Sequence, residues 1–347
     1  MPVLPPATLP DTRKVARAAE ALVLPAAPGV VLARVCAVAV LFIWISFILV
    51  ARGSARATLM PLDIAWLRFA FSGLVVLPIA WFYRAWLVRG LTAGVDAGAA
   101  GGVALRRALA LGLIGGVGYS FLAYSGFFLA PVAHAAVLLP GSLPLWSTLG
   151  ALILLGERLT WPRVLGLALI LAGGAAVAGT SVLEAFAGQG TWRGDLLFIA
   201  ASISWATYGV LCRRWRVGAL QATAAIALVS LVAVVPAFAL AVLGGVMPSR
   251  LGSAPWGELV FQAVYQGGLA MLVAGVAFTQ VVAHYGPVRT TMFTAIVPPL
   301  AALAAVPVLG EPLAASALLG LACVTLGLLV GSGVVGWPRR RPPGAVR

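Results

Sequence analysis

The sequence is a succession of long apolar runs, separated by short gaps that contain arginine, glycine or proline. A helix that crosses the hydrocarbon core of a bilayer needs about 20 apolar residues. Lipid offers the backbone no hydrogen-bond partners, so single apolar runs of this length cross it as helices. Dividing the chain at charges and Gly/Pro clusters predicts an all-α membrane protein with ten transmembrane helices, at residues 33–52, 62–83, 107–128, 131–154, 161–181, 194–213, 218–246, 257–282, 287–309 and 313–335. Turns near Pro131, Pro287 and Pro312 divide runs that are too long for one crossing.

The composition favours the same class and argues against a soluble domain. The chain is 62% hydrophobic and 9% charged, whereas soluble domains carry about 25% charged residues. The net charge of +14 does not indicate nucleic acid, because the arginines lie in short gaps rather than on one basic face. Three cysteines, Cys36, Cys212 and Cys323, lie inside apolar segments and are not spaced as a metal site.

The distribution of basic residues predicts which way the chain is inserted. With the N-terminus inside and ten spans, 18 basic residues lie on the cytoplasmic side and 4 outside, with Arg68 within a span. Short cytoplasmic loops carry the excess of positive charge, so we expect both termini to be cytoplasmic. All but one of the 23 basic residues are arginine, which favours a bacterial inner (plasma) membrane. Residues 1–29 and 337–347 are predicted to be cytoplasmic tails, the first of them mobile and the second basic.

A repeat divides the chain into two halves. The motif LGE occurs at residues 155–157 and again 154 residues later, at 309–311. The same offset aligns Pro144 with Pro298, Gly166 with Gly320 and Gly173 with Gly327. The halves, about 30–182 and 190–336, would hold five helices each, and an odd number inverts the second half relative to the first. Inverted repeats are typical of secondary transporters, whose binding site lies between the halves near the midplane of the membrane.

The chain resembles the EamA type of the drug/metabolite transporter superfamily, which has two five-helix EamA domains. The resemblance rests on "WLRFAFSG" (66–73) and on residues 142–174 and 284–331, which carry the P…LGE…G pattern in both halves. It covers about residues 30–336, and it implies a transporter that exports amino acids, drugs or other small metabolites.

Prolines and one arginine are candidate site residues. Pro140 and Pro144 are predicted to interrupt the fourth span, and Pro298 and Pro299 the ninth. Interrupted helices at matching places point to a transporter's binding site, although prolines also form kinks that only improve packing. Arg68 could contact an anion in the cavity, or could extend along its helix to the outer water surface.

Aromatic and polar side chains gather in three spans and form a second candidate group. A cavity for an amphipathic solute needs apolar bodies with a few hydrogen-bonding groups, but hydrogen bonds between helices would use the same residue types. Trp44 could be a cavity wall or an interfacial anchor. The group comprises Tyr119, Ser120 and Tyr124; Ser202, Ser204, Trp205 and Tyr208; and Tyr265, Gln266 and Gln280.

The two LGE glutamates, Glu157 and Glu311, are expected at opposite faces of the membrane. Each could accept hydrogen bonds from the first amides of the next helix, or could hold a loop in one conformation only and so act as a gate. Gly166 and Gly320 are expected to be positions of close helix packing.

Several patterns are missing from the sequence. It contains no G-x-x-x-x-G-K-[ST] loop for ATP, no Asp or Glu deep in a span, and no metal-binding or nucleophilic constellation. We therefore expect no cofactor and no enzyme activity, and the coupling ion stays open. The expected partners are a small-molecule solute and the lipid bilayer, with a homodimer as a further candidate. The alternative function is that of a non-transporting polytopic membrane protein.

Overall fold

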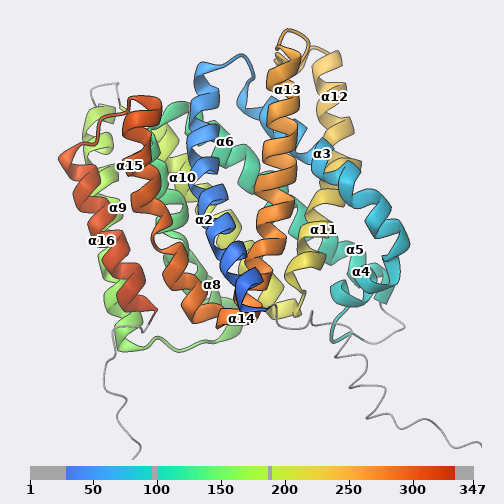
Figure 1. The fold of residues 1–347 in the computed structure, drawn as a ribbon, viewed down its shortest axis with the longest axis horizontal. Coiled ribbons are helices and arrows are strands. Elements are labelled where there is room, and N and C mark those ends of the chain that lie inside the picture. The colour runs from blue at the N-terminus through green and yellow to red at the C-terminus, as the bar shows by residue number, and fades with distance from the viewer. Residues whose placement is uncertain (1–28, 96–99, 187–189, 333–347) are drawn as a thin grey trace, which may run out of the picture.

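The computed structural model describes residues 29–95, 100–186 and 190–332, and every regular element in these ranges is a helix (Figure 1). The predicted cytoplasmic tails, 1–29 and 337–347, lie outside the described residues except for Gly29.

The first half contains α-helices joined by π-helical and 3-10 segments. In chain order these are α2 (Val30–Gly53), η1 (Ser54–Arg56), α3 (Pro61–Phe82), α4 (Arg84–Leu91), α5 (Ala100–Leu111), η3 (Gly112–Gly118), α6 (Tyr119–Leu129), α7 (Val132–Ala136), η4 (Val137–Gly141), α8 (Leu143–Leu155) and α9 (Trp161–Phe186).

The second half follows a similar order. Its elements are α10 (Trp192–Trp215), α11 (Ala219–Val229), η5 (Ser230–Val234), α12 (Val235–Leu243), α13 (Trp256–Gln262), η6 (Ala263–Val273), α14 (Ala274–Thr294), α15 (Val297–Leu309) and α16 (Ala315–Gly331). The π-helical segments η3 and η6 lie inside the third apolar run of each half, and such segments often occur at functional sites.

Within the described residues, eight continuous helical stretches are long and apolar enough to cross a membrane, and α15 and α16 are shorter apolar helices. The helix bounds follow most of the predicted spans closely, but the predicted turn near Pro287 is wrong. Helix α14 continues through that position to Thr294, and the chain breaks only at Ala295–Ile296. Proline is tolerated within membrane helices because neighbouring groups satisfy the freed carbonyl.

The predicted interruption of the ninth span also needs correction. Pro298 does not interrupt a longer helix, because it is the second residue of α15, where proline's missing N–H costs nothing. Pro144 is likewise the second residue of α8, but it directly follows a break at Ser142 that lies inside the predicted fourth span. Residues 84–91, between two predicted spans, form the helix α4, which carries Arg84 and Arg89.

The LGE motif has the same local structure in both halves. Helices α8 and α15 have 13 residues each, and both end at a left-handed glycine with φ 66° and ψ 24°, Gly156 and Gly310. Glycine adopts this conformation without the strain that a Cβ would bring. The turn places Glu157 and Glu311 directly beyond the helix ends.

Helices α9 and α16 pack against each other through glycines. A Cβ at Gly166 would lie 2.6 Å from the carbonyl oxygen of Gly327, and one at Gly173 would lie 2.6 Å from that of Gly320. Because the early residue of α9 contacts the late residue of α16, the two helices run antiparallel (Figure 1).

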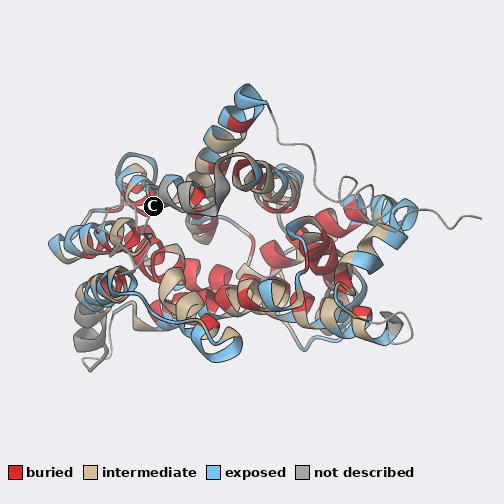
Figure 2. Ribbon diagram, turned by 90° about the horizontal axis from the view of Figure 1, so that it is seen from below, coloured by how far each residue is buried: buried red, intermediate tan, exposed pale blue. Residues whose placement is uncertain are grey.

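Burial follows the inner faces of the helices (Figure 2). The largest buried cluster joins residues from both halves, among them Phe69, Phe127, Phe198 and Val324. Trp81, Phe82 and Trp256 lie near helix ends and are exposed, in the pattern of aromatic residues at a membrane–water interface.

Candidate functional site

A chain of five buried polar side chains runs through the bundle, and we call it the polar chain. Arg68 Nη1 lies 3.3 Å from the Tyr124 hydroxyl, which lies 2.9 Å from Gln266 Oε1. Gln266 Nε2 is 3.2 Å from Gln262 Oε1, and Gln262 Nε2 is 2.7 Å from Ser54 Oγ. All five residues are buried, and they come from α3, α6, η6, α13 and η1.

The arginine sets the direction of every hydrogen bond in the polar chain. A guanidinium can only donate, so the Tyr124 hydroxyl accepts from Arg68 and donates its own hydrogen to Gln266. Each amide then accepts at its oxygen and donates from its nitrogen, and Ser54 finally donates to the Val50 carbonyl at 2.7 Å. Bonds aligned in this way polarise one another.

Arg68 is turned into the bundle, and the residue is only 7% exposed. Its guanidinium carbon lies 5.8 Å from the centre of the Phe47 ring. Among the described residues its Nε has no hydrogen-bond partner. Backbone packing fixes the helix here, because a Cβ at Gly267 would lie 2.8 Å from the Arg68 carbonyl oxygen.

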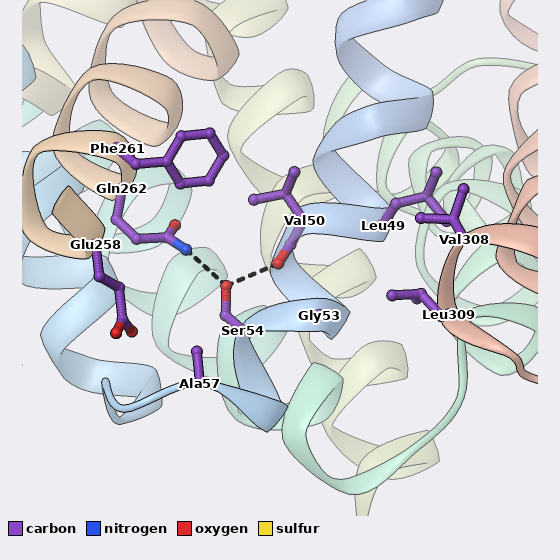
Figure 3. Close-up of a pocket in the computed structure, with 10 residues that line it drawn as sticks. All are labelled: Leu49, Val50, Gly53, Ser54, Ala57, Glu258, Phe261, Gln262, Val308 and Leu309. Atoms are coloured by element: carbon purple, nitrogen blue, oxygen red, sulfur yellow. Dashed lines mark hydrogen bonds between the residues drawn. The ribbon is translucent and has the colours of Figure 1, made fainter. Parts of the chain in front are cut away.

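The polar chain leads to a pocket of about 350 Å³ between α2, α13 and α15. Figure 3 shows Glu258 and Gln262 on one wall, Val308 and Leu309 on the other, and Ser54 between them. Glu258 accepts hydrogen bonds from the backbone N–H groups of Thr58 and Leu59. The pocket is otherwise apolar, lined by Leu49, Val50, Gly53, Ala57 and Phe261.

Three predicted site residues form an aromatic cluster beside η3. The ring centre of Trp205 lies 4.8 Å from that of Tyr119 and 4.9 Å from that of Tyr208. Tyr208 packs over Gly115, where a Cβ would lie 2.4 Å from the tyrosine ring. This cluster joins α6 of the first half to α10 of the second.

The remaining predicted residues lie apart from the polar chain. Trp44 stacks on Phe278 of α14, with ring centres 5.2 Å apart, and Gln280 lies half-buried on the same helix. Pro144 and Pro298 lie at the starts of α8 and α15. Arg68, Tyr124 and Gln266 are the predicted site residues that the structure joins to one another by hydrogen bonds, among the residues it describes.

Glu311 joins the second half of the chain to the first. Its Oε1 lies 2.5 Å from Arg52 Nε, and its Oε2 accepts from the Val132 N–H at 2.8 Å. Arg52 also donates to the Phe127 carbonyl. The expected capping of the next helix is therefore corrected, because Glu311 caps α7 of the other half rather than α16.

Glu157 forms the matching contact at the opposite end of the bundle. It pairs with Arg213 at the end of α10 and with Arg163 of α9. Its hydrogen-bond partners in the described residues are these two arginine side chains, so the structure does not give it the expected role of capping the amides of α9. Figure 1 shows the α8–α9 connection at one end of the bundle and the α15–α16 connection at the other. We call these the Glu157 end and the Glu311 end.

Sequence reasoning missed several buried polar residues. Asp195, at the start of α10, lies 2.8 Å from His134 Nδ1. Asp63 accepts from Ser249, from the Arg250 N–H and from the Met60 N–H. Both aspartates follow apparent helix starts, a signal that could have marked them. Within the described ranges, no group of three or more His, Cys, Asp and Glu could hold a metal ion.

The chain is similar to known proteins in both sequence and fold. The chain is 28% identical over 237 residues to "Uncharacterized transporter YyaM" of Bacillus subtilis (strain 168), a match that covers 67% of this chain and 74% of the relative. A solved structure described as "Crystal structure of protein" is 22% identical, with a TM-score of 0.50, and the match covers 86% of this chain and 95% of that one. At this identity the likeness concerns the fold alone.

The sequence profile of the EamA-like transporter family matches the chain twice, at residues 29–178 and 192–332. These two regions correspond to the two repeats inferred from the LGE motifs. The chain is therefore a multi-pass membrane protein that belongs to the EamA-like transporter family.

Proposed function

We propose that the protein is a secondary transporter that exports small amphipathic metabolites, such as amino acids or drugs, across the inner membrane by alternating access. In this proposal the chain crosses the membrane ten times, as two inverted five-helix repeats over residues 30–182 and 190–336. Both termini lie in the cytoplasm.

The observation that carries the proposal is the crossed pairing of glycines between α9 and α16. Gly166 and Gly320 occupy equivalent positions in the two repeats, as do Gly173 and Gly327. The contacts, however, pair Gly166 with Gly327 and Gly173 with Gly320. Exchanging the two repeats turns one contact into the other, which is the behaviour of equivalent helices related by an axis in the membrane plane.

Exchanging the two repeats also turns one of the two glutamate ion pairs into the other. Glu157 pairs with an arginine at the end of the second half's first helix, and Glu311 with one at the end of the first half's first helix. The Arg52 and Glu311 side chains are 21% and 10% exposed, whereas those of Arg213 and Glu157 are 55% and 33% exposed. The Glu311 pair is thus the more buried of the two, and alternating access would release one pair while the other forms.

Between these ends, the polar chain and the aromatic cluster are the candidate solute contacts. Arg68, Tyr124 and Gln266 would supply hydrogen bonds, while Trp44, Tyr119, Trp205, Tyr208 and Gln280 would line the path. Pro144 and Pro298 would fix the starts of α8 and α15 at equivalent places in the two halves.

Reconstitution of the purified chain tests the proposal. Proteoliposomes should accumulate members of a radiolabelled panel of amino acids and amphipathic drugs, saturably and above protein-free liposomes. Repeating the measurement with and without a pH gradient decides whether protons are coupled. If no solute moves and none competes for binding, the transport function is wrong.

A further inference from the structure

We propose that Arg68 is an anion-recognition residue, and that it binds the carboxylate of a solute with an apolar body. The inference rests on the proposed function in one respect, that a solute enters the bundle. The inference names the substrate class for that site.

Arg68 has no carboxylate partner among the side chains that the structure describes. The structure describes the side chains of five carboxylates, and each of them has another partner. Asp63 binds Ser249 and backbone amides, Glu258 binds backbone amides, and Asp195 binds His134. Glu157 binds Arg163 and Arg213, and Glu311 binds Arg52 and the Val132 N–H. A buried cation without a counter-ion is costly and is retained where it has a purpose.

The hydrogen-bonding capacity of Arg68 is also unfilled. Its bond to the Tyr124 hydroxyl is long, at 3.3 Å, and its Nε lacks a partner among the described residues. A guanidinium presents its donors as a planar fork that matches the two oxygens of a carboxylate. Tyr124 offers one neutral oxygen, which cannot supply either the second acceptor or the negative charge.

The polar chain cannot supply that charge either. Its donors all point away from Arg68, towards the Val50 carbonyl. The chain therefore holds Tyr124 with its oxygen facing the cation and adds no anion of its own. This arrangement keeps the guanidinium in place and leaves its remaining donors for an external group.

The surroundings of the guanidinium favour an organic acid over an inorganic anion. Phe47 lies against Arg68, and its ring centre is 6.2 Å from that of Tyr124 and 5.9 Å from that of Phe127. These rings would pack on an apolar body attached to the carboxylate. With Arg68 only 7% exposed, the solute would reach it when the bundle opens.

Three probes of similar shape and different charge test the proposal. Phenylacetate, phenylacetamide and 2-phenylethylammonium are each measured by equilibrium dialysis against the full-length protein in lipid nanodiscs near pH 7. We expect phenylacetate to bind about tenfold or more tightly than the other two, the effect of one charge-assisted hydrogen-bonded contact. Equal binding of all three, or no binding of phenylacetate, would overturn the proposal, and so would equal competition by inorganic phosphate.

Variants separate recognition from a structural role. Arg68→Gln should abolish the preference for phenylacetate, and Arg68→Lys should keep the preference with weaker binding because a lysine lacks the planar fork. Arg89→Gln, which removes an exposed arginine of α4, is the matched control and should bind as the wild type does. A preference that survives in folded Arg68→Gln contradicts the proposal; if that variant does not fold, the wild-type and Arg68→Lys measurements decide.

Flux of the same probes in proteoliposomes distinguishes this inference from the proposed function. Transport of the neutral or cationic probe without carboxylate preference would refute the inference and leave the transporter standing. Arg68-dependent binding of phenylacetate, with no flux of any solute in the wider panel, would support the site and refute transport.

Discussion

Glu311 and Arg52 form an ion pair between the two halves of the chain, with 2.5 Å between Glu311 Oε1 and Arg52 Nε. The residues are 259 positions apart, and the same carboxylate also accepts the first N–H of α7. One side chain thus connects α2, α7 and the α15–α16 connection at the Glu311 end.

Replacing Glu311 by glutamine should lower the free energy of unfolding. The substitution removes the negative charge that faces a mostly buried arginine, at a cost of about 2–3 kcal/mol. Glu157→Gln is the matched control, because its pair is much more exposed and should cost about 1 kcal/mol or less. Thermal unfolding in detergent compares the two variants, and equal losses would contradict an unequal contribution of the two ion pairs to stability.

Gly173→Ala should weaken the contact between α9 and α16. The added Cβ would lie 2.6 Å from the backbone oxygen of Gly320, and overpacking of this kind costs about 1–3 kcal/mol. Gly174→Ala is the control from the same helix, since the nearest atom to its Cβ would be 3.8 Å away. That variant should unfold at or above the wild-type temperature; equal effects at both positions would mean that the glycine contact does not hold the helices.

Tyr124→Phe should destabilise the protein although it removes only one hydroxyl. The change leaves Arg68 Nη1 without its acceptor and Gln266 Oε1 without its donor, and unsatisfied buried groups cost about 1–3 kcal/mol. Tyr83→Phe, at an exposed end of α3, should be neutral. Thermal unfolding of both variants measures the difference, and a neutral Tyr124→Phe would show that the polar chain contributes nothing to stability.

Trp205→Ala should weaken the transport of aromatic solutes. It removes the ring that lies between Tyr119 and Tyr208. One aromatic–aromatic contact contributes about 0.5–1.5 kcal/mol beyond the area that it buries, and an aromatic solute would lose such a contact. The half-saturation concentration should therefore rise severalfold in proteoliposomes. Trp81→Ala, which removes an exposed tryptophan of α3, should leave it unchanged. An unaltered value for Trp205→Ala would remove this residue from the solute path.

The apolar runs predicted most helices because a helix that crosses lipid needs about 20 apolar residues, and runs of this length can be recognised in the sequence. The error near Pro287 arose because proline was treated as a turn, whereas α14 continues through it. The helix α4 was missed for another reason. Its eight residues are too short and too basic to register as a span.

The site was less predictable, because its partners are distant in sequence. Tyr124 and Gln266 are 142 residues apart, and no local pattern connects them to Arg68. The glycines illustrate the same limit. The offset of 154 residues aligns Gly166 with Gly320, but the contact is between Gly166 and Gly327, because alignment identifies equivalent positions and not neighbours in space.

Reversible locking of each end tests alternating access most directly. In a chain whose native cysteines Cys36, Cys212 and Cys323 are replaced by serine, one variant carries Arg52→Cys with Glu311→Cys, and another carries Glu157→Cys with Arg213→Cys. A short reducible bifunctional thiol reagent joins each pair, and the four single-cysteine variants treated alike are the controls. We predict that either crosslink alone stops solute flux in proteoliposomes, and that reduction restores it. Flux that continues while a pair is quantitatively crosslinked would contradict the account.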